Sequence, residues 1–149
     1  MILVTGLAVL DDGPLVRCEL LLLPGCSQDR ALQAFTDPDL LRSWWHGELT
    51  TDLVAGGPYT VWFAPIPARM TGRVVRYEPP RVLEFSWAWE HEPDRPERRV
   101  TVEAATAADG AAVLTVAHGP HADDEEGRKA RAEHHEGWEY FLPKLAAAV

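Results

Sequence analysis

Residues 82–90 alternate between two kinds of side chain, and this alternation constrains the fold of the chain more than any other feature. One parity carries large apolar side chains, and the other carries small or charged ones. The first set is Leu83, Phe85, Trp87 and Trp89, and the second is Glu84, Ser86, Ala88 and Glu90. Because successive side chains of a β-strand point to opposite faces, the segment is predicted to be a strand with one face in a core. Such strands are typical of an antiparallel sheet that is covered on one side.

Further strands are predicted on both sides of this segment, because apolar runs recur there between turn signals. The turn signals are Gly56-Gly57, Pro79-Pro80 and Asp109-Gly110. The expected strands are 51–54, 59–63, 70–77, 99–107 and 111–118. At the N-terminus, the apolar runs 2–10 and 15–23 flank Asp11-Asp12-Gly13-Pro14, which predicts a hairpin. Its first strand, within about residues 1–12, is expected to be an extension of the sheet.

Helical signals occur in three places. Ser27 is expected to cap a short helix, and Asp37, followed by Pro38, is expected to cap a second one. Apolar side chains of the second helix recur at three- and four-residue spacing, at Leu40, Leu41, Trp44 and Trp45. A long helix is predicted over about residues 125–148, with an apolar stripe along one side. The stripe consists of Ala130, His134, Trp138, Phe141 or Leu142, and Leu145.

The composition indicates one globular domain over residues 1–149. Hydrophobic residues make up 46% of the chain and charged residues 25%, which is ordinary for a folded domain of this length. No repeat, linker or low-complexity tract divides it. Cys18 and Cys26 are expected to be free thiols, because a chain with a sufficient core does not need a disulfide.

The charge and the hydropathy exclude several classes of partner. A net charge of −9 argues against nucleic acid, which binds basic surfaces, and against anionic membranes. No apolar run approaches the roughly 20 residues of a spanning helix, and residues 1–10 lack the charged start of a secretory signal. A cytoplasmic location is therefore expected.

A series of short motifs also falls in a characteristic order along the chain. It begins with residues 31–38 (ALQAFTDP) and 40–45 (LLRSWW), and continues with Gly56-Gly57, Gly72-Arg73-Val74, Pro79-Pro80, residues 83–87 (LEFSW), His118 and Gly137-Trp138. This order resembles the activator of heat-shock-protein-90 ATPase homologue family, a branch of the START-like (SRPBCC) superfamily. The resemblance covers all but about the first dozen residues. It implies an α+β helix-grip fold, in which a curved antiparallel sheet wraps around the long C-terminal helix and two short helices follow the first strand. The periodicity agrees with this fold.

The aromatic side chains allow two interpretations. They could form a solid core between helix and sheet, or some could line a cavity, as the resemblance implies. The candidate cavity residues are Trp45, Tyr59, Phe63, Phe85, Trp87, His118 and Trp138. Trp62 has the opposite parity to Phe63, so it is expected to point outward, where it could contribute to a homodimer contact.

The histidines give a weak catalytic candidate and no metal site. His118 ends the last strand and is expected to face the long helix. A histidine there could act as a general acid or base, but a packing or cavity-rim role is preferred. His118, His121, His134 and His135 lie close in sequence, with Glu133 and Glu136. However, His134 and His135 point about 100° apart on a helix, so this group is interpreted as a solvated helix face without a metal. No glycine-rich phosphate or dinucleotide motif is present, and no cofactor is expected.

Three functions remain open from the sequence. The leading one is a domain that binds a small hydrophobic or aromatic ligand between sheet and helix, without catalysis. The alternative is a cyclase, dehydratase or other ligand-modifying enzyme, as some START-like relatives are; a pair of convergent titratable residues in the cavity would favour it. The third is an interaction module. A chaperone partner ranks below self-association, because the chain corresponds to the single domain without the additional N-terminal domain of the eukaryotic activator.

Overall fold

The computed structural model of the protein describes residues 6–23 and 25–149, apart from the side chain of Asp11. Within these residues, nine strands form an antiparallel sheet in the order β1-β2-β9-β8-β7-β5-β4-β3, and β6 pairs with β7. The strands are β1 (Leu7–Asp12), β2 (Leu15–Leu21), β3 (Glu48–Thr51), β4 (Tyr59–Phe63), β5 (Ala68–Thr71), β6 (Val74–Glu78), β7 (Val82–Trp89), β8 (Arg98–Thr106) and β9 (Ala112–Gly119).

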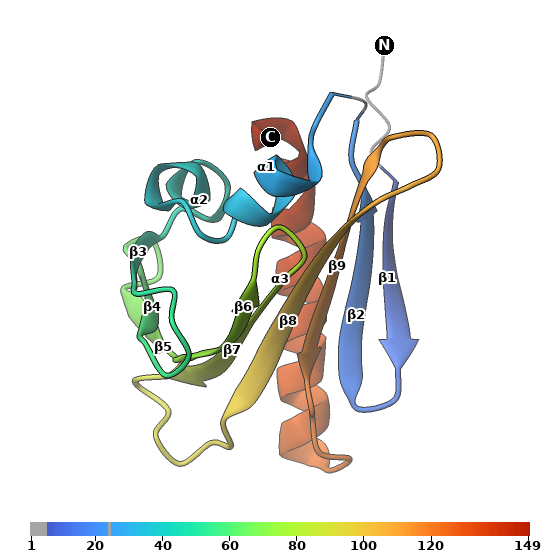
Figure 1. Ribbon diagram of the computed structural model, residues 1–149. Helices are drawn as coiled ribbons and strands as arrows, with labels where there is room; N and C mark the ends of the chain where they lie inside the picture. The colour runs from blue at the N-terminus through green and yellow to red at the C-terminus, as the bar shows by residue number, and fades with distance from the viewer. Residues whose placement is uncertain (1–5, 24) are drawn as a thin grey trace.

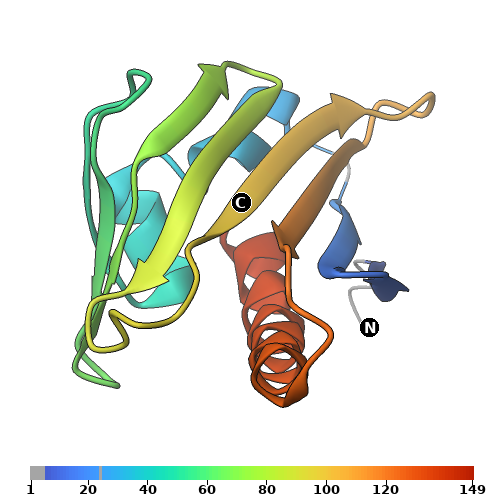
Figure 2. The same ribbon diagram turned by 90° about the horizontal axis from the view of Figure 1, so that it is seen from below.

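Three helices complete the described fold. The long helix α3 (Glu125–Ala148) lies in the hollow of the curved sheet, as Figure 2 shows from below. The short helices α1 (Gln28–Gln33) and α2 (Pro38–Trp45) lie at the end of the molecule where α3 terminates (Figure 1). The α+β helix-grip fold is therefore confirmed. No helix of the described residues is long and apolar enough to cross a membrane.

The N-terminal hairpin forms as its turn signal predicts. Asp12 pairs with Leu15, so Gly13 and Pro14 make the turn, and Gly13 has a φ of 57°, which glycine adopts without strain. Strand β1 is the predicted extension, and it occupies one edge of the sheet. Residues 1–5 and 24, which the predicted hairpin and its end also included, lie outside the described residues.

The prediction of one strand over residues 70–77 is wrong, because the chain is interrupted between β5 and β6. Arg73 is held to Ser86 of β7 by two hydrogen bonds, from Arg73 N to Ser86 Oγ and from Ser86 N to Arg73 O, both 2.9 Å long. A Cβ on Gly72 would lie 2.0 Å from the Ser86 carbonyl oxygen. This close approach requires glycine. The interruption lets β6 pair with the first half of β7 and β5 with its last residues.

The predicted caps of both short helices are confirmed. Ser27 Oγ accepts a hydrogen bond from the backbone N–H of Arg30 at 3.0 Å. Asp37 Oδ1 accepts from the N–H groups of Asp39 and Leu40, at 2.9 and 3.4 Å. These contacts satisfy donors that have no partner within the first turn of a helix.

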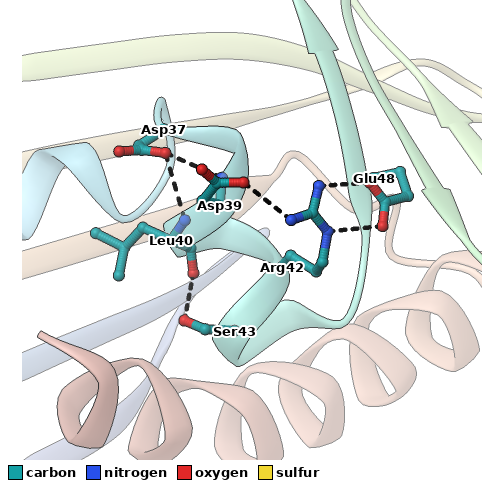
Figure 3. Close-up of polar contacts among 6 residues, drawn as sticks. All are labelled: Asp37, Asp39, Leu40, Arg42, Ser43 and Glu48. Atoms are coloured by element: carbon teal, nitrogen blue, oxygen red, sulfur yellow. Dashed lines mark hydrogen bonds and ion pairs between the residues drawn. The ribbon is translucent and has the colours of Figure 1, made fainter.

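A network of ion pairs then joins α2 to β3 (Figure 3). The Arg42 guanidinium donates to both carboxylate oxygens of Glu48, at 2.8 and 2.9 Å, and to Asp39 at 2.9 Å. The hydrogen bond from Arg42 lowers the pKa of Glu48. Because the network is exposed to solvent, its contribution to the free energy of unfolding is small. Its role is geometric, since it holds the last turn of α2, which carries Trp45, against the edge of the sheet.

The core lies between α3, the short helices and the concave face of the sheet. Its buried members include Cys18, Leu20, Leu114, Trp138 and Leu142. On α3, the side chain of Asp124 caps the first turn by accepting from Gly127 N at 2.7 Å. The buried residues of α3 include Ala130, Trp138, Leu142 and Leu145, which belong to the predicted stripe. Both cysteines are free thiols, as predicted.

Candidate functional site

A pocket between α3, the end of α2 and strands β4 and β7 forms the candidate site. Its volume is about 360 Å³, which lies toward the lower end of the range of small-molecule sites, roughly 300–1,000 Å³. The lining residues are Trp45, His46, Phe63, Pro65, Ile66, Trp87, Trp89, His118, Glu133, His134, Gly137, Trp138, Tyr140 and Phe141. Ile66 and Tyr140 are 59% and 60% exposed, so they form the rim of the pocket toward solvent.

Aromatic rings that contact one another build the wall of the pocket. Trp45, at the end of α2, is their centre: its ring centroid lies 5.4 Å from that of Phe63, 5.9 Å from that of Trp87 and 5.4 Å from that of Trp138. Behind it, Trp44 stacks on Trp45 at 4.9 Å and donates its indole N–H to the Ala34 carbonyl at 2.9 Å. The wall is therefore fixed by packing from four elements, α2, β4, β7 and α3, and a ligand would meet a preformed surface.

The structure places five of the seven predicted cavity residues in the lining: Trp45, Phe63, Trp87, His118 and Trp138. The prediction for Tyr59 and Phe85 needs correction, because both are fully buried in the core and outside the pocket lining. Their rings stack on each other at 4.0 Å, and the Tyr59 hydroxyl donates to the Phe35 carbonyl at 2.6 Å. They have the correct parity, but they lie farther along the sheet, where Tyr59 contacts Phe35 in the segment between α1 and α2. Trp62 points outward, as predicted, and is 36% exposed.

Nine lining residues were not predicted. They are His46, Pro65, Ile66, Trp89, Glu133, His134, Gly137, Tyr140 and Phe141. Trp89 had the right parity in its strand, and His134 and Phe141 belonged to the predicted stripe of α3, so a signal existed for these three. Pro65 and Ile66 lie in the turn between β4 and β5, where no periodicity applies.

Three histidines meet at the inner end of this pocket, where the end of β9 faces α3. The ring of His118 stacks on that of His134, with centroids 4.0 Å apart and planes 22° apart. His121 Nε2 lies 2.8 Å from His134 Nδ1. The interpretation of His134 as part of a solvated helix face is therefore wrong, because the β9–α3 connection folds back and brings His121 against it. His118 and His121 are both buried.

The hydrogen-bond partners of these rings determine where their protons lie. His118 Nδ1 accepts from the indole N–H of Trp138 at 3.0 Å, so the proton of neutral His118 is on Nε2. His121 Nδ1 lies 3.0 Å from the Pro14 carbonyl, which can only accept, so His121 carries its proton on Nδ1. His121 Nε2 then accepts from Nδ1–H of His134. Nε2 of neutral His134 then carries a lone pair, and no residue in the described part of the chain donates a hydrogen bond to it.

All three rings favour the neutral form. Burial lowers the pKa of His118 well below its usual value, and His134, His121 and Arg98 lower it further. Burial, followed by the charges of His121, Arg98 and Arg95, lowers the pKa of His134 to about 3. Burial also lowers the pKa of His121, against the opposing effect of its hydrogen bond to Pro14.

The same bonds bear on metal binding. His118 Nδ1 and both nitrogens of His121 are occupied by hydrogen bonds within the protein. Among the described residues, no group of three or more His, Cys, Asp and Glu side chains has an arrangement that could hold a metal ion. A metal-free site stays a prediction.

Solved structures share this architecture. DynU16, a protein in the dynemicin biosynthetic locus, is 25% identical over 90% of this chain, with a TM-score of 0.75. This chain spans about half the length of DynU16, 46%. CalU16 from Micromonospora echinospora is 23% identical with a TM-score of 0.69, over 97% of this chain and 83% of its own. MLL2253 from Mesorhizobium loti is 19% identical with a TM-score of 0.76, over 90% and 95%. The last two likenesses show the fold alone.

A comparison with protein families agrees with the fold. No match was found among curated proteins. Residues 26–149, which include both short helices, the pocket and α3, match the family described as activator of Hsp90 ATPase homolog 1-like protein. Since this match covers most of the chain, the protein belongs to the activator of Hsp90 ATPase homologue 1-like family, within the START-like superfamily.

Proposed function

We propose that this protein binds a small, largely apolar aromatic ligand in the pocket between β7, α2 and α3. The observation that carries the proposal is the preformed wall of tryptophan and phenylalanine rings around Trp45. Burial of apolar ligand surface is favourable by about 25 cal/mol per Å², and stacking on aromatic rings adds to it. The residues proposed to contact the ligand include Trp45, Phe63, Trp87, Trp89 and Trp138.

The polar groups of the pocket are few and would orient the ligand. They include His46, Glu133 and His134, with His118 behind them and the hydroxyl of Tyr140 at the rim. The Tyr59 hydroxyl is not among them, because it is bonded to the Phe35 carbonyl. A ligand with one polar group at the histidine end and an apolar body fits this distribution. The source of DynU16, a biosynthetic locus, is consistent with a small-molecule partner for this fold.

A ligand-modifying enzyme is the second candidate, and the meeting of His118 with His134 favours it. The sequence offered only one titratable candidate, whereas the pocket contains two stacked imidazoles. However, an effective general base near neutral pH needs a pKa near 7, and the pKa of His134 is lowered to about 3. Such a ring accepts a hydrogen bond well but retains an abstracted proton poorly. Because the pKa of His134 is far below that of an effective general base, we prefer binding to catalysis.

Self-association is a weaker third candidate. Trp62 faces outward, but the Arg69 guanidinium lies over its ring, 5.2 Å from the centroid, so the exposed indole already has a partner. A chaperone partner ranks below this. Residues 1–149 are proposed to act as one domain.

Filling the pocket tests the proposal. A Cβ on Gly137, which lines the pocket, would meet no atom within 4 Å, so Gly137→Leu should place its side chain in the hollow without displacing the fold. Naphthalene and related bicyclic aromatics should quench or shift the tryptophan emission of the wild type. In Gly137→Leu their affinity should fall at least tenfold, whereas Glu136→Leu, on the exposed side of the same turn, should bind like the wild type. A panel that leaves the emission and the melting temperature of the wild type unchanged would contradict the proposal.

A further inference from the structure

The histidine end of the pocket presents a fixed hydrogen-bond acceptor. The chain of bonds begins at the Pro14 carbonyl, which is an acceptor only, and continues through His121 to His134. Each bond fixes the tautomer of the next ring, so Nδ1–H of His134 points to His121 and its Nε2 has no proton. Among the residues that the structure describes, none donates a hydrogen bond to this Nε2 atom, and His134 is only half-buried on the wall of the pocket.

Beside His134, the ring of His118 carries a hydrogen-bond donor that has no acceptor among the described residues. Because the Trp138 indole donates to Nδ1 of His118, the proton of His118 is on Nε2. This buried N–H has no hydrogen-bond partner in the described part of the chain. The His118 ring stacks directly on that of His134, at 4.0 Å between centroids. An unpaired buried donor destabilises the site, and a ligand atom that accepts from it would remove that cost.

We infer that the pocket recognises its aromatic ligand by a ring hydroxyl, a phenol or enol, which donates its proton in a hydrogen bond to His134 Nε2. The inference rests on the proposed function, and it adds the chemical class of the ligand. A hydroxyl both donates and accepts at one atom, so its oxygen is also an acceptor for the unpaired N–H of His118, whose ring stacks on that of His134. His121 acts as a positioning residue, because it orients His134 without touching the ligand.

The surrounding charges favour a neutral donor over a charged one. An ammonium group would add positive charge near Arg95 and Arg98, both of which act electrostatically on His134. A carboxylate has no proton to give to Nε2, and Glu133 in the pocket lining would repel it. A phenol or enol carries no net charge and keeps a flat apolar body for the tryptophan wall.

The experiment compares three ligands of one shape at neutral pH. We expect the wild type to bind 2-naphthol at least tenfold more tightly than 2-methylnaphthalene, which has the same outline without the hydroxyl. It should also prefer 2-naphthol at least tenfold over 2-methoxynaphthalene, which keeps the oxygen but lacks the proton. A tenfold ratio corresponds to about 1.4 kcal/mol. Since apolar burial favours the methyl compound, a preference for the hydroxyl requires a polar contact.

Two histidine variants assign the contact. In His134→Leu the three ligands should bind with similar affinity, because the acceptor is gone. His135→Leu is the matched control, since His135 is the next residue of α3 and lies outside the pocket lining; its preference should equal that of the wild type. His134→Gln, which restores an acceptor oxygen, should recover part of the preference.

The outcomes separate this inference from the proposed function. If the wild type binds all three compounds equally, or if the preference survives in His134→Leu, the inference is wrong and aromatic binding stands. If none of the compounds binds, both the inference and the proposed binding of aromatic ligands are wrong. The comparison of ligands on the wild type needs no variant to fold, so the inference can fail even if His134→Leu is unstable.

Discussion

His118 and Trp138 form a buried pair that ties β9 to α3. The indole N–H of Trp138 donates to Nδ1 of His118 over 3.0 Å, and both side chains are buried. The sequence predicted that these residues would face each other, because His118 shares the parity of the inward residues and Trp138 belongs to the helix stripe. The stripe also places His134 on the same side of the helix as Trp138. Nothing in the sequence predicted that His121 would join them, since that contact depends on how the β9–α3 connection folds back.

Two substitutions of His118 should differ in stability. His118→Leu leaves the Trp138 N–H buried without an acceptor, which should lower the free energy of unfolding by about 1–3 kcal/mol. His118→Gln can place its amide oxygen near the indole and should lower it less. Urea denaturation of both variants gives the comparison. Equal stability of the two would show that the bond to Trp138 is not what makes His118 important for folding.

Stability should fall on mild acidification because of the histidines. Since the fold lowers the pKa of His118, His121 and His134, the unfolded chain binds more protons than the folded chain below its own histidine pKa of about 6.5. The free energy of unfolding should therefore decrease as the pH falls from about 6.5 toward the folded pKa of His134, about 3. Each such histidine contributes a slope of up to about 1.4 kcal/mol per pH unit.

Comparing variants isolates this effect from that of the carboxylates, which also titrate in acid. Between pH 7.5 and 5, the stability of His134→Gln should depend less steeply on pH than that of the wild type. His135→Gln, with the same change at the neighbouring position, should keep the wild-type slope. Identical slopes in all three proteins would contradict the assignment of His134 as neutral in the fold.

At the scale of elements, the strands and helices with one clear periodicity were predicted well. Alternation located β7, and capping residues located both short helices, because these patterns reflect local geometry. The interruption between β5 and β6 was missed because its cause is not local: Ser86 of another strand binds Arg73, and Gly72 approaches the backbone of that strand. The prediction that Tyr59 and Phe85 line the pocket was wrong for a similar reason. The alternation of side chains predicts which face of the sheet a residue is on, but it does not predict how far along the strand the pocket lies.

Helix α3 contains a glycine whose replacement should stabilise the protein. Gly137 lies in the interior of the helix, where glycine is about 1 kcal/mol less favourable than alanine, and a Cβ there meets no atom within 4 Å. Gly137→Ala should therefore raise the free energy of unfolding by about 0.5–1 kcal/mol, measured by urea denaturation. At the same time, the methyl group should weaken the binding of aromatic ligands.

Gly127 in the same helix is the contrasting position. A Cβ there would lie 2.0 Å from the Ala122 carbonyl oxygen, so Gly127→Ala should destabilise the protein. A stabilised Gly127→Ala, or a Gly137→Ala variant that loses stability, would show that the surroundings of these glycines differ from those described.

At the scale of the whole molecule, the order of periodic segments was enough to predict a curved sheet around one helix. It was not enough to predict the pocket, because the same aromatic residues could have formed a solid core. The separation of α3 from β7 depends on the stacking of several rings around Trp45 and on the turn after β4. These are long-range packing effects that no single segment encodes.

The tryptophans themselves provide the most direct test of ligand binding in the pocket. Four of the six, Trp45, Trp87, Trp89 and Trp138, line it, whereas Trp44 lies behind Trp45 and Trp62 faces outward. The measurement is a ¹H–¹⁵N spectrum of the indole N–H groups during titration with 2-naphthol. The four pocket signals should move and saturate with one dissociation constant, and that of Trp62 should stay in place. If the pocket signals remain still at saturating ligand, or if Trp62 moves as much as they do, the protein does not bind aromatic ligands in this pocket.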